Sequence, residues 1–171
     1  MSRRLLRLEM PVFPDRRMFR LHDATVDPDA PGSPLPPDGA LISVTREQLW
    51  VASLQEVISV QLLLEEWDSA PPPSGERWED EAKAVLYLRG AVSVDMGTAG
   101  KAVGNLKLAG GVGDYVVRVF ARNRTEVTHR YRDLLRGLDP LSDEFEQARR
   151  DLDGLEQDLL QMWRGSCAAR G

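Results

Sequence analysis

The chain has 171 residues, a formal net charge of −5 and a single cysteine, Cys167. This length suits one domain with an appendage, and one cysteine excludes an internal disulfide framework. No apolar run reaches the roughly 18 residues of a membrane-spanning helix, and the charged, proline-containing start does not fit an export signal. We therefore expect a cytoplasmic protein without membrane contact.

Residues 1–15 form a basic N-terminal segment, and the stretch RRMFRLHDA after it predicts a first strand. Residues 27–39, DPDAPGSPLPPDG, contain five prolines and two glycines. Such a composition is typical of an irregular loop. We place this loop inside a β-domain that spans residues 16–126.

Alternation of apolar and polar residues predicts several further strands. The stretches EVISVQLLLEEW, DEAKAVLYLRG, AVSVDM and GDYVVRVFARNR have the two-residue period of half-buried strands, and SAPPPSGERW interrupts them. Gly90 predicts a tight turn. The gaps between Trp78 and Arg124 are too short for the helices that a parallel sheet requires. We predict a mainly β fold, an antiparallel β-sandwich of about seven strands.

Residues 127–165 follow a helical period instead. Apolar residues recur in alternating steps of three and four from Tyr131 to Met162, and Asp139-Pro140 suits the start of a second helix. We predict two C-terminal α-helices, a helical appendage packed on the sandwich. Alternatively, the heptad helix mediates self-association into a homodimer, through Phe145, Leu152, Leu155, Leu159 and Met162.

The sequence lacks the patterns that identify an enzyme or a metal protein. Two histidines and one terminal cysteine do not suffice for a Cys/His zinc site, and the glycines around Lys101 do not have phosphate-loop spacing. No serine lies in a G-x-S-x-G elbow. We assign no catalytic, cofactor-binding or metal-binding residue and expect no cofactor.

Negative charge gathers around two tryptophans. Residues 65–81 contain seven carboxylates and one arginine, and tryptophans are enriched at binding hot spots. Carboxylates at this edge would attract a basic protein partner. This hypothesis assigns partner binding to Glu65, Glu66, Trp67, Asp68, Trp78, Glu79, Asp80 and Glu81.

Positive charge gathers in residues 118–136, which contain six arginines. Two interpretations stay open, because these arginines either bind an external anion or pair with the acidic tail helix. The whole chain is acidic and contains three lysines, which disfavours direct nucleic-acid binding.

The stretches WEDEAKAVLYL, GDYVVRV and LLQMW follow a proline-rich break in this order. Over residues 16–163 the chain resembles bacterial β-sandwich proteins of the competence-associated nuclease inhibitor type and their uncharacterised actinobacterial relatives. The resemblance implies a small cytoplasmic protein that binds another protein, as an inhibitor or immunity factor.

We therefore predict a non-enzymatic protein-binding module that engages a basic partner, such as a nuclease, through its acidic, tryptophan-containing edge. One alternative is a self-associating structural subunit that uses the C-terminal heptad helix. Another is an enzyme or small-ligand carrier with a pocket inside the sandwich, although no motif identifies residues for it.

Overall fold

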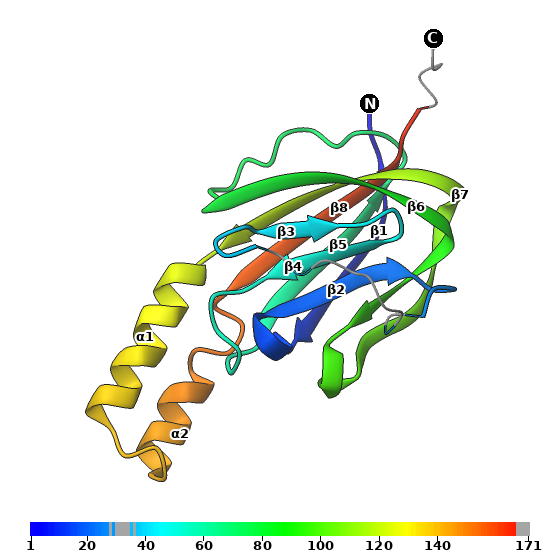
Figure 1. Cartoon of the computed structure of the whole chain (residues 1–171). Helices are drawn as coiled ribbons and strands as arrows, with labels where there is room; N and C mark the ends of the chain where they lie inside the picture. Colours follow the sequence, from blue (N-terminus) through cyan, green and yellow to red (C-terminus); the bar gives the residue numbers. More distant parts are fainter. Residues whose placement is uncertain (28, 30–34, 36, 167–171) are drawn as a thin grey trace.

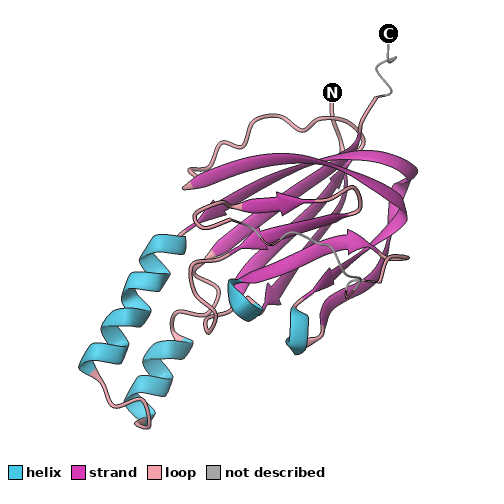
Figure 2. Cartoon of the chain, viewed as in Figure 1, coloured by secondary structure: helices cyan, strands magenta, loops and turns pink. Residues whose placement is uncertain are grey.

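The computed structural model of the protein describes residues 1–27, 29, 35 and 37–166. The strands are β1 (Arg4–Val12), β2 (Met18–Asp23), β3 (Ile42–Val44), β4 (Gln48–Ala52), β5 (Val60–Trp67), β6 (Asp80–Asp95), β7 (Lys101–Arg122) and β8 (Gln157–Arg164). The helices are α1 (Arg124–Gly137) and α2 (Asp143–Arg150), with short 3-10 turns η1 (Asp15–Arg17) and η2 (Gly97–Ala99). The predicted mainly β class with two helices is confirmed (Figures 1 and 2).

Across the described residues, the eight strands form one sheet in the order β1-β5-β8-β7-β6-β2-β4-β3. Neighbouring strands are antiparallel except β5 and β8, which are parallel. The sheet curves, so that β2, β3 and β4 lie in front of β1, β5 and β8 in Figure 1. Leu21 of β2, Val51 of β4 and Leu62 of β5 belong to the same buried core. One curved sheet, rather than two separate sheets, therefore encloses the core.

The long strands β6 and β7 carry the sheet around this curve. Their pairing register shifts between Arg89 and Ala91, and the glycine between them, Gly90, has φ +94°. On β7, Gly111 has φ +69°, a left-handed conformation that glycine adopts without a Cβ clash. The Tyr115 hydroxyl donates to the Gly111 carbonyl at 2.7 Å, and its burial raises the pKa of Tyr115 to about 12. Gly90 thus marks a bend inside β6 rather than the predicted turn.

The predicted helix extending to Met162 is wrong, because residues 157–164 form β8. This strand lies between β5 and β7 in the sheet. Leu160 and Met162 enter the core, while Leu159 and Trp163 are buried on the opposite face. The sequence of a strand that is buried on both faces is a nearly continuous apolar run. Such a run also contains apolar residues at the spacings of three and four that are typical of a helix.

The residues assigned to self-association consequently do not share a helix face. Phe145 lies in α2, and Leu152 and Leu155 lie in the turn after it. Leu159 and Met162 are buried in β8, with 7% and 0% of their surface exposed. Self-association through a heptad helix therefore loses its structural basis.

The two helices form a hairpin that projects from one end of the sheet (Figures 1 and 2). Tyr131 of α1 contacts Phe145 of α2, with ring centroids 6.4 Å apart. At the base of the hairpin, Val127 and Leu152 pack against Ile58, which precedes β5. The helical appendage thus contacts the sheet domain through its base. In the part of the chain that is described, no helix combines the length and apolarity that crossing a bilayer requires.

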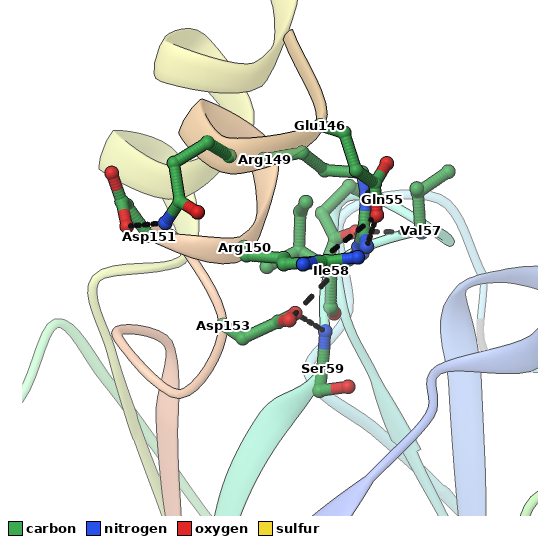
Figure 3. A network of polar contacts seen from close by, with 10 residues as sticks. Gln55, Val57, Ile58, Ser59, Glu146, Arg149, Arg150, Asp151 and Asp153 are labelled. Carbon is green, nitrogen blue, oxygen red and sulfur yellow. Dashed lines mark hydrogen bonds and ion pairs between the residues drawn. The ribbon is translucent and has the colours of Figure 1, made fainter. Parts of the chain in front are cut away.

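Polar contacts at this base connect the hairpin to the segment before β5. Figure 3 shows the Asp153 carboxylate accepting the backbone N–H of Ser59 at 3.0 Å, close to the Glu146–Arg149 ion pair of α2. Gln55 from the same segment donates to the Glu156 carboxylate at 3.2 Å. These contacts fix the chain at the point where it leaves the hairpin and enters β8.

Candidate partner-binding site

The outer face of the sheet carries polar and aromatic side chains, whereas its inner face is apolar. Leu62 and Leu64 of β5 are fully buried in the core, so the residues that alternate with them face outward. The same alternation in β7 and β8 brings outward residues of three adjacent strands together. They are Gln61, Leu63, Glu65 and Trp67 of β5, Gln157, Leu159, Gln161 and Trp163 of β8, and Arg118, Phe120 and Arg122 of β7.

Residues 68–79, here named the strap, connect β5 to β6 over this outer face (Figure 1). Three consecutive prolines restrict the backbone of the strap and remove three N–H donors, so this stretch does not pair as a strand. Trp78 packs on Phe120, with ring centroids 5.5 Å apart. Its indole N–H donates to the Ser74 hydroxyl at 3.0 Å, which ties the end of the strap to its middle.

A cavity of about 450 Å³, here named the strap cavity, lies between the strap and the outer face. This volume falls within the range of about 300–1,000 Å³ that is usual for ligand pockets. Its lining includes Arg7 and Glu9 of β1, Trp67 of β5, Trp78 of the strap, and Gln157 and Gln161 of β8.

Glu65 organises one side of the strap cavity. Its side chain is buried and forms ion pairs with Arg4 at 3.1 Å and Arg7 at 3.4 Å. The same carboxylate accepts the indole N–H of Trp67 at 2.8 Å and the amide N–H of Gln161 at 3.1 Å. Four donors therefore converge on one buried carboxylate, which fixes the orientation of the indole and of the amide.

Arg122 organises the other side. Its guanidinium carbon lies 4.5 Å from the centroid of the Trp78 ring, a cation–π contact. The guanidinium also donates to the Gln157 side-chain oxygen at 2.8 Å and to the Glu76 carboxylate at 3.0 Å. Further along the face, the Arg118 guanidinium lies 5.2 Å from the Trp163 ring.

Five of the six arginines in residues 118–136 have partners other than an acidic tail helix. Arg118 and Arg122 contact β8, which takes the place of that helix. Arg124 is buried and pairs with Asp80 at 3.4 Å. Arg130 and Arg136 form ion pairs with carboxylates of α1 itself.

Two of the eight residues predicted to bind a partner lie inside the fold. Glu65 and Glu66 are 4% and 2% exposed. Glu66 faces the inner side of the sheet and accepts the backbone N–H groups of Ala109 and Gly110 at 3.0 and 2.9 Å. Both carboxylates therefore stabilise the fold rather than form a free acidic surface.

The other predicted residues are accessible. Trp67 and Trp78 are half-buried and line the strap cavity together. Asp68, Glu79 and Glu81 are exposed. A second cavity, of about 530 Å³, lies beside Trp78 and is lined by Glu79, Asp80, Glu81, Arg118 and Phe120 among others. The structure thus places both tryptophans at the strap cavity, and it places the carboxylates of residues 79–81 beside Trp78 at the second cavity.

A buried acidic pair was not predicted from the sequence. Glu156 and Asp158 are both 0% exposed, near the buried Arg124. Burial raises the pKa of Asp158 well above its ordinary value, and the neighbouring Glu156 charge adds to this. Burial also raises the pKa of Glu156, although hydrogen bonds from Ser53 and Gln55 oppose the shift. The sequence indication of this pair is Asp158, which alternates with Leu160 and Met162 at a two-residue period and so lies on the same face of β8. It becomes recognisable only when residues 157–164 are assigned as a strand.

The described residues hold no group of three or more histidine, cysteine, aspartate and glutamate side chains that is placed to bind a metal ion. The acidic pair is therefore not accompanied by a third such ligand there. Within the pair, Glu156 accepts hydrogen bonds from the Ser53 hydroxyl, at 2.8 and 2.9 Å, and from the Gln55 amide.

Two solved structures are similar to this fold. ComJ from Bacillus subtilis, described as an inhibitor of the DNA-degrading activity of NucA, superposes with a TM-score of 0.58 and 8% sequence identity, covering 96% of this chain and 99% of that chain. A protein described as crocagin biosynthetic gene J has a TM-score of 0.55 and 13% identity, covering 97% and 99%. The predicted resemblance to the nuclease-inhibitor type is confirmed at the level of the fold. No protein-family model and no curated protein sequence matches the chain.

Proposed function

We propose that the chain is a non-enzymatic protein-binding module of the inhibitor or immunity type, and that the strap and the outer face beneath it contact the partner. The observation that carries this proposal is the position of Trp67 and Trp78, half-buried at one cavity of the outer face. Half-buried tryptophans beside a cavity offer the large, rigid contact area that is enriched at protein interfaces.

The charge around Trp78 favours a basic partner. Glu79 and Glu81 are exposed, and the cavity beside Trp78 also contains Asp80 and Glu76 against Arg118. Exposed carboxylates at the rim of an interface raise the rate of association with a positively charged protein. A basic enzyme such as a nuclease has this charge.

The fold likeness supports the same class of function. ComJ, which shares the fold over nearly the whole of both chains, is described as inhibiting a DNA-degrading activity. At 8% identity this likeness carries the architecture and not the contact residues, so the strap is assigned from this chain alone.

A second candidate is a small-ligand carrier, because the strap cavity has the volume of a ligand pocket. The core between the curved halves of the sheet is filled by fully buried side chains such as Leu62 and Leu86. A small ligand would therefore bind on the outer face, and not inside the sheet as expected from the sequence.

The test is affinity capture from the source organism with the full chain, followed by mass spectrometry. The compared variant is Trp67→Ala/Trp78→Ala, and the matched control is Trp50→Ala, since Trp50 is also half-buried but lies on β4. Folding of each is checked by circular dichroism. We expect the wild type and the control to capture one basic protein that the double variant loses. Equal capture of that protein by all three would overturn the assignment to the strap.

A further inference from the structure

The outer face already contains one complete guanidinium site. The guanidinium of Arg122 lies 4.5 Å from the Trp78 ring centroid and donates to the Gln157 side-chain oxygen at 2.8 Å. It also forms an ion pair with Glu76 at 3.0 Å. An indole face, an amide oxygen and a carboxylate are thus sufficient to hold a guanidinium here.

A second set of the same residue types lies in the same cavity. Gln161 follows Gln157 by four residues on β8, so both side chains face outward. The Gln161 amide N–H donates to Glu65 at 3.1 Å, which also holds the Trp67 indole. Trp67, Gln161 and Glu65 therefore repeat the combination of indole, amide and carboxylate.

This second set has an acceptor without a donor. Because the Gln161 nitrogen is committed to the Glu65 carboxylate, the side-chain oxygen Oε1 is the remaining group of that amide. Gln161 is 5% exposed, and its Oε1 accepts no hydrogen bond from any described residue. The cation–π contacts of the described residues place guanidinium groups over Trp50, Trp78 and Trp163 and not over Trp67. A buried acceptor gains most from an incoming donor.

The charged groups of the strap cavity are paired with one another. Its lining contains the carboxylates Glu9, Glu65 and Glu76 against the guanidinium groups of Arg7 and Arg122. Arg7 is bound to Glu9 and Glu65, and Arg122 is bound to Glu76. Arg4 also pairs with Glu65, at 3.1 Å, so the three carboxylates face three guanidinium groups. A bound cation would therefore be held by the Trp67 ring and by Gln161 Oε1 rather than by an excess of negative charge.

We propose that the strap cavity binds an arginine side chain of the protein partner, with its guanidinium over the Trp67 ring and hydrogen-bonded to Gln161 Oε1. This inference rests on the proposed function, since it names the group through which a basic partner is recognised. Arginine suits the site better than lysine, because a guanidinium is planar, stacks on an indole face and is more weakly hydrated than an ammonium.

The experiment titrates the full, ¹⁵N-labelled chain with Nα-acetyl-arginine N-methylamide and follows the four tryptophan indole N–H signals by NMR. The comparison ligand is the citrulline analogue, which has the same shape without the charge. We expect saturable shifts of the Trp67 signal with arginine, at a dissociation constant in the millimolar range (about 1–10 mM). Equal shifts with citrulline, or no shift up to about 20 mM arginine, would overturn the inference.

Gln161→Met tests the acceptor, because methionine has a similar length but no strong acceptor oxygen. The matched control is Gln147→Met on the exposed face of α2. We expect Gln161→Met to weaken arginine binding by about tenfold and the control to leave it unchanged. Unchanged binding by a folded Gln161→Met variant would remove Gln161 from the site and overturn the proposed geometry.

The two proposals fail in different ways. If arginine does not bind but partner capture is lost in Trp67→Ala/Trp78→Ala, the arginine site is overturned while the protein-binding function stands. If arginine binds at Trp67 but partner capture is unchanged in the double variant, the arginine site is supported and the assignment of the strap to the partner is overturned.

Discussion

Glu66 and Asp158 are both acidic and both lie at the inner face of the sheet, but they affect the stability of the fold in opposite ways. Glu66 of β5 accepts two backbone N–H groups from the middle of β7 and so connects these two strands. Asp158 is 0% exposed, and neither of its oxygens accepts a hydrogen bond from the residues that the structure describes. Burial without donors favours the protonated carboxyl group, which raises the pKa of Asp158. Asp158 is therefore a destabilising residue at neutral pH.

Asp158→Asn is expected to stabilise the fold. Because the folded-state pKa is raised, the folded protein keeps a proton that the unfolded chain loses, so stability falls as pH rises above the unfolded value of about 3.9. The variant removes this loss and gains on the order of 1–3 kcal/mol at pH 7, but nothing below pH of about 3.5. Urea unfolding at several pH values measures this difference.

Glu156 and Arg124 also face Asp158, and both are unchanged in this variant. A stability difference between Asp158→Asn and wild type that does not vary with pH would contradict the assignment of the titration to Asp158.

Glu65→Gln is expected to destabilise the fold. The substitution removes the charge that two arginines, the Trp67 indole and the Gln161 amide share. We expect a loss of about 2–4 kcal/mol in the free energy of unfolding, measured by urea denaturation. The control Glu9→Gln breaks an exposed pair with Arg7 and should stay within about 0.5 kcal/mol of wild type. Equal effects of the two substitutions would contradict the central role of Glu65.

At the scale of elements, most strands with one apolar face were predictable, but β1 and β8 were not. β1 lies in the segment that was assigned as basic, and β8 is buried on both faces. The alternation in DEAKAVLYLRG gives the first part of β6 directly, because Ala84, Leu86 and Leu88 are buried while Lys83 and Val85 are exposed. In β8 both faces are buried, so its period does not distinguish a strand from a helix. The strap was recognised as a break in the strands, but its position over the outer face depends on contacts distant in sequence, such as Trp78 on Phe120.

A chain ending at Leu138 tests the assignment of β8. Truncation there removes α2 and β8, and β8 hydrogen-bonds to both β5 and β7 along most of its length. We expect loss of the β-sheet signal in far-UV circular dichroism, whereas a chain ending at Ser166 keeps it. A Leu138-terminated chain with a full β-sheet spectrum would show that β8 is dispensable, as a docked helix would be.

At the scale of the whole molecule, one curved sheet separates the stabilising core from the surface proposed to bind. The helical hairpin extends from one end of the sheet, and the strap lies over the outer face (Figure 1). The candidate site could be predicted in part, because the tryptophans and carboxylates of residues 65–81 were recognised from composition. The burial of Glu65 and Glu66, and the contribution of Gln161 from β8, follow from strand pairing and could not be read from spacing alone.

Hydrogen–deuterium exchange of the full chain, alone and with the captured partner, tests most directly whether the strap face is the binding surface. We predict slower exchange in residues 68–81 and 116–122 on addition of the partner, because a contact there covers the strap and the strand beneath it. Protection confined to the helical hairpin, with unchanged exchange in the strap, would contradict it.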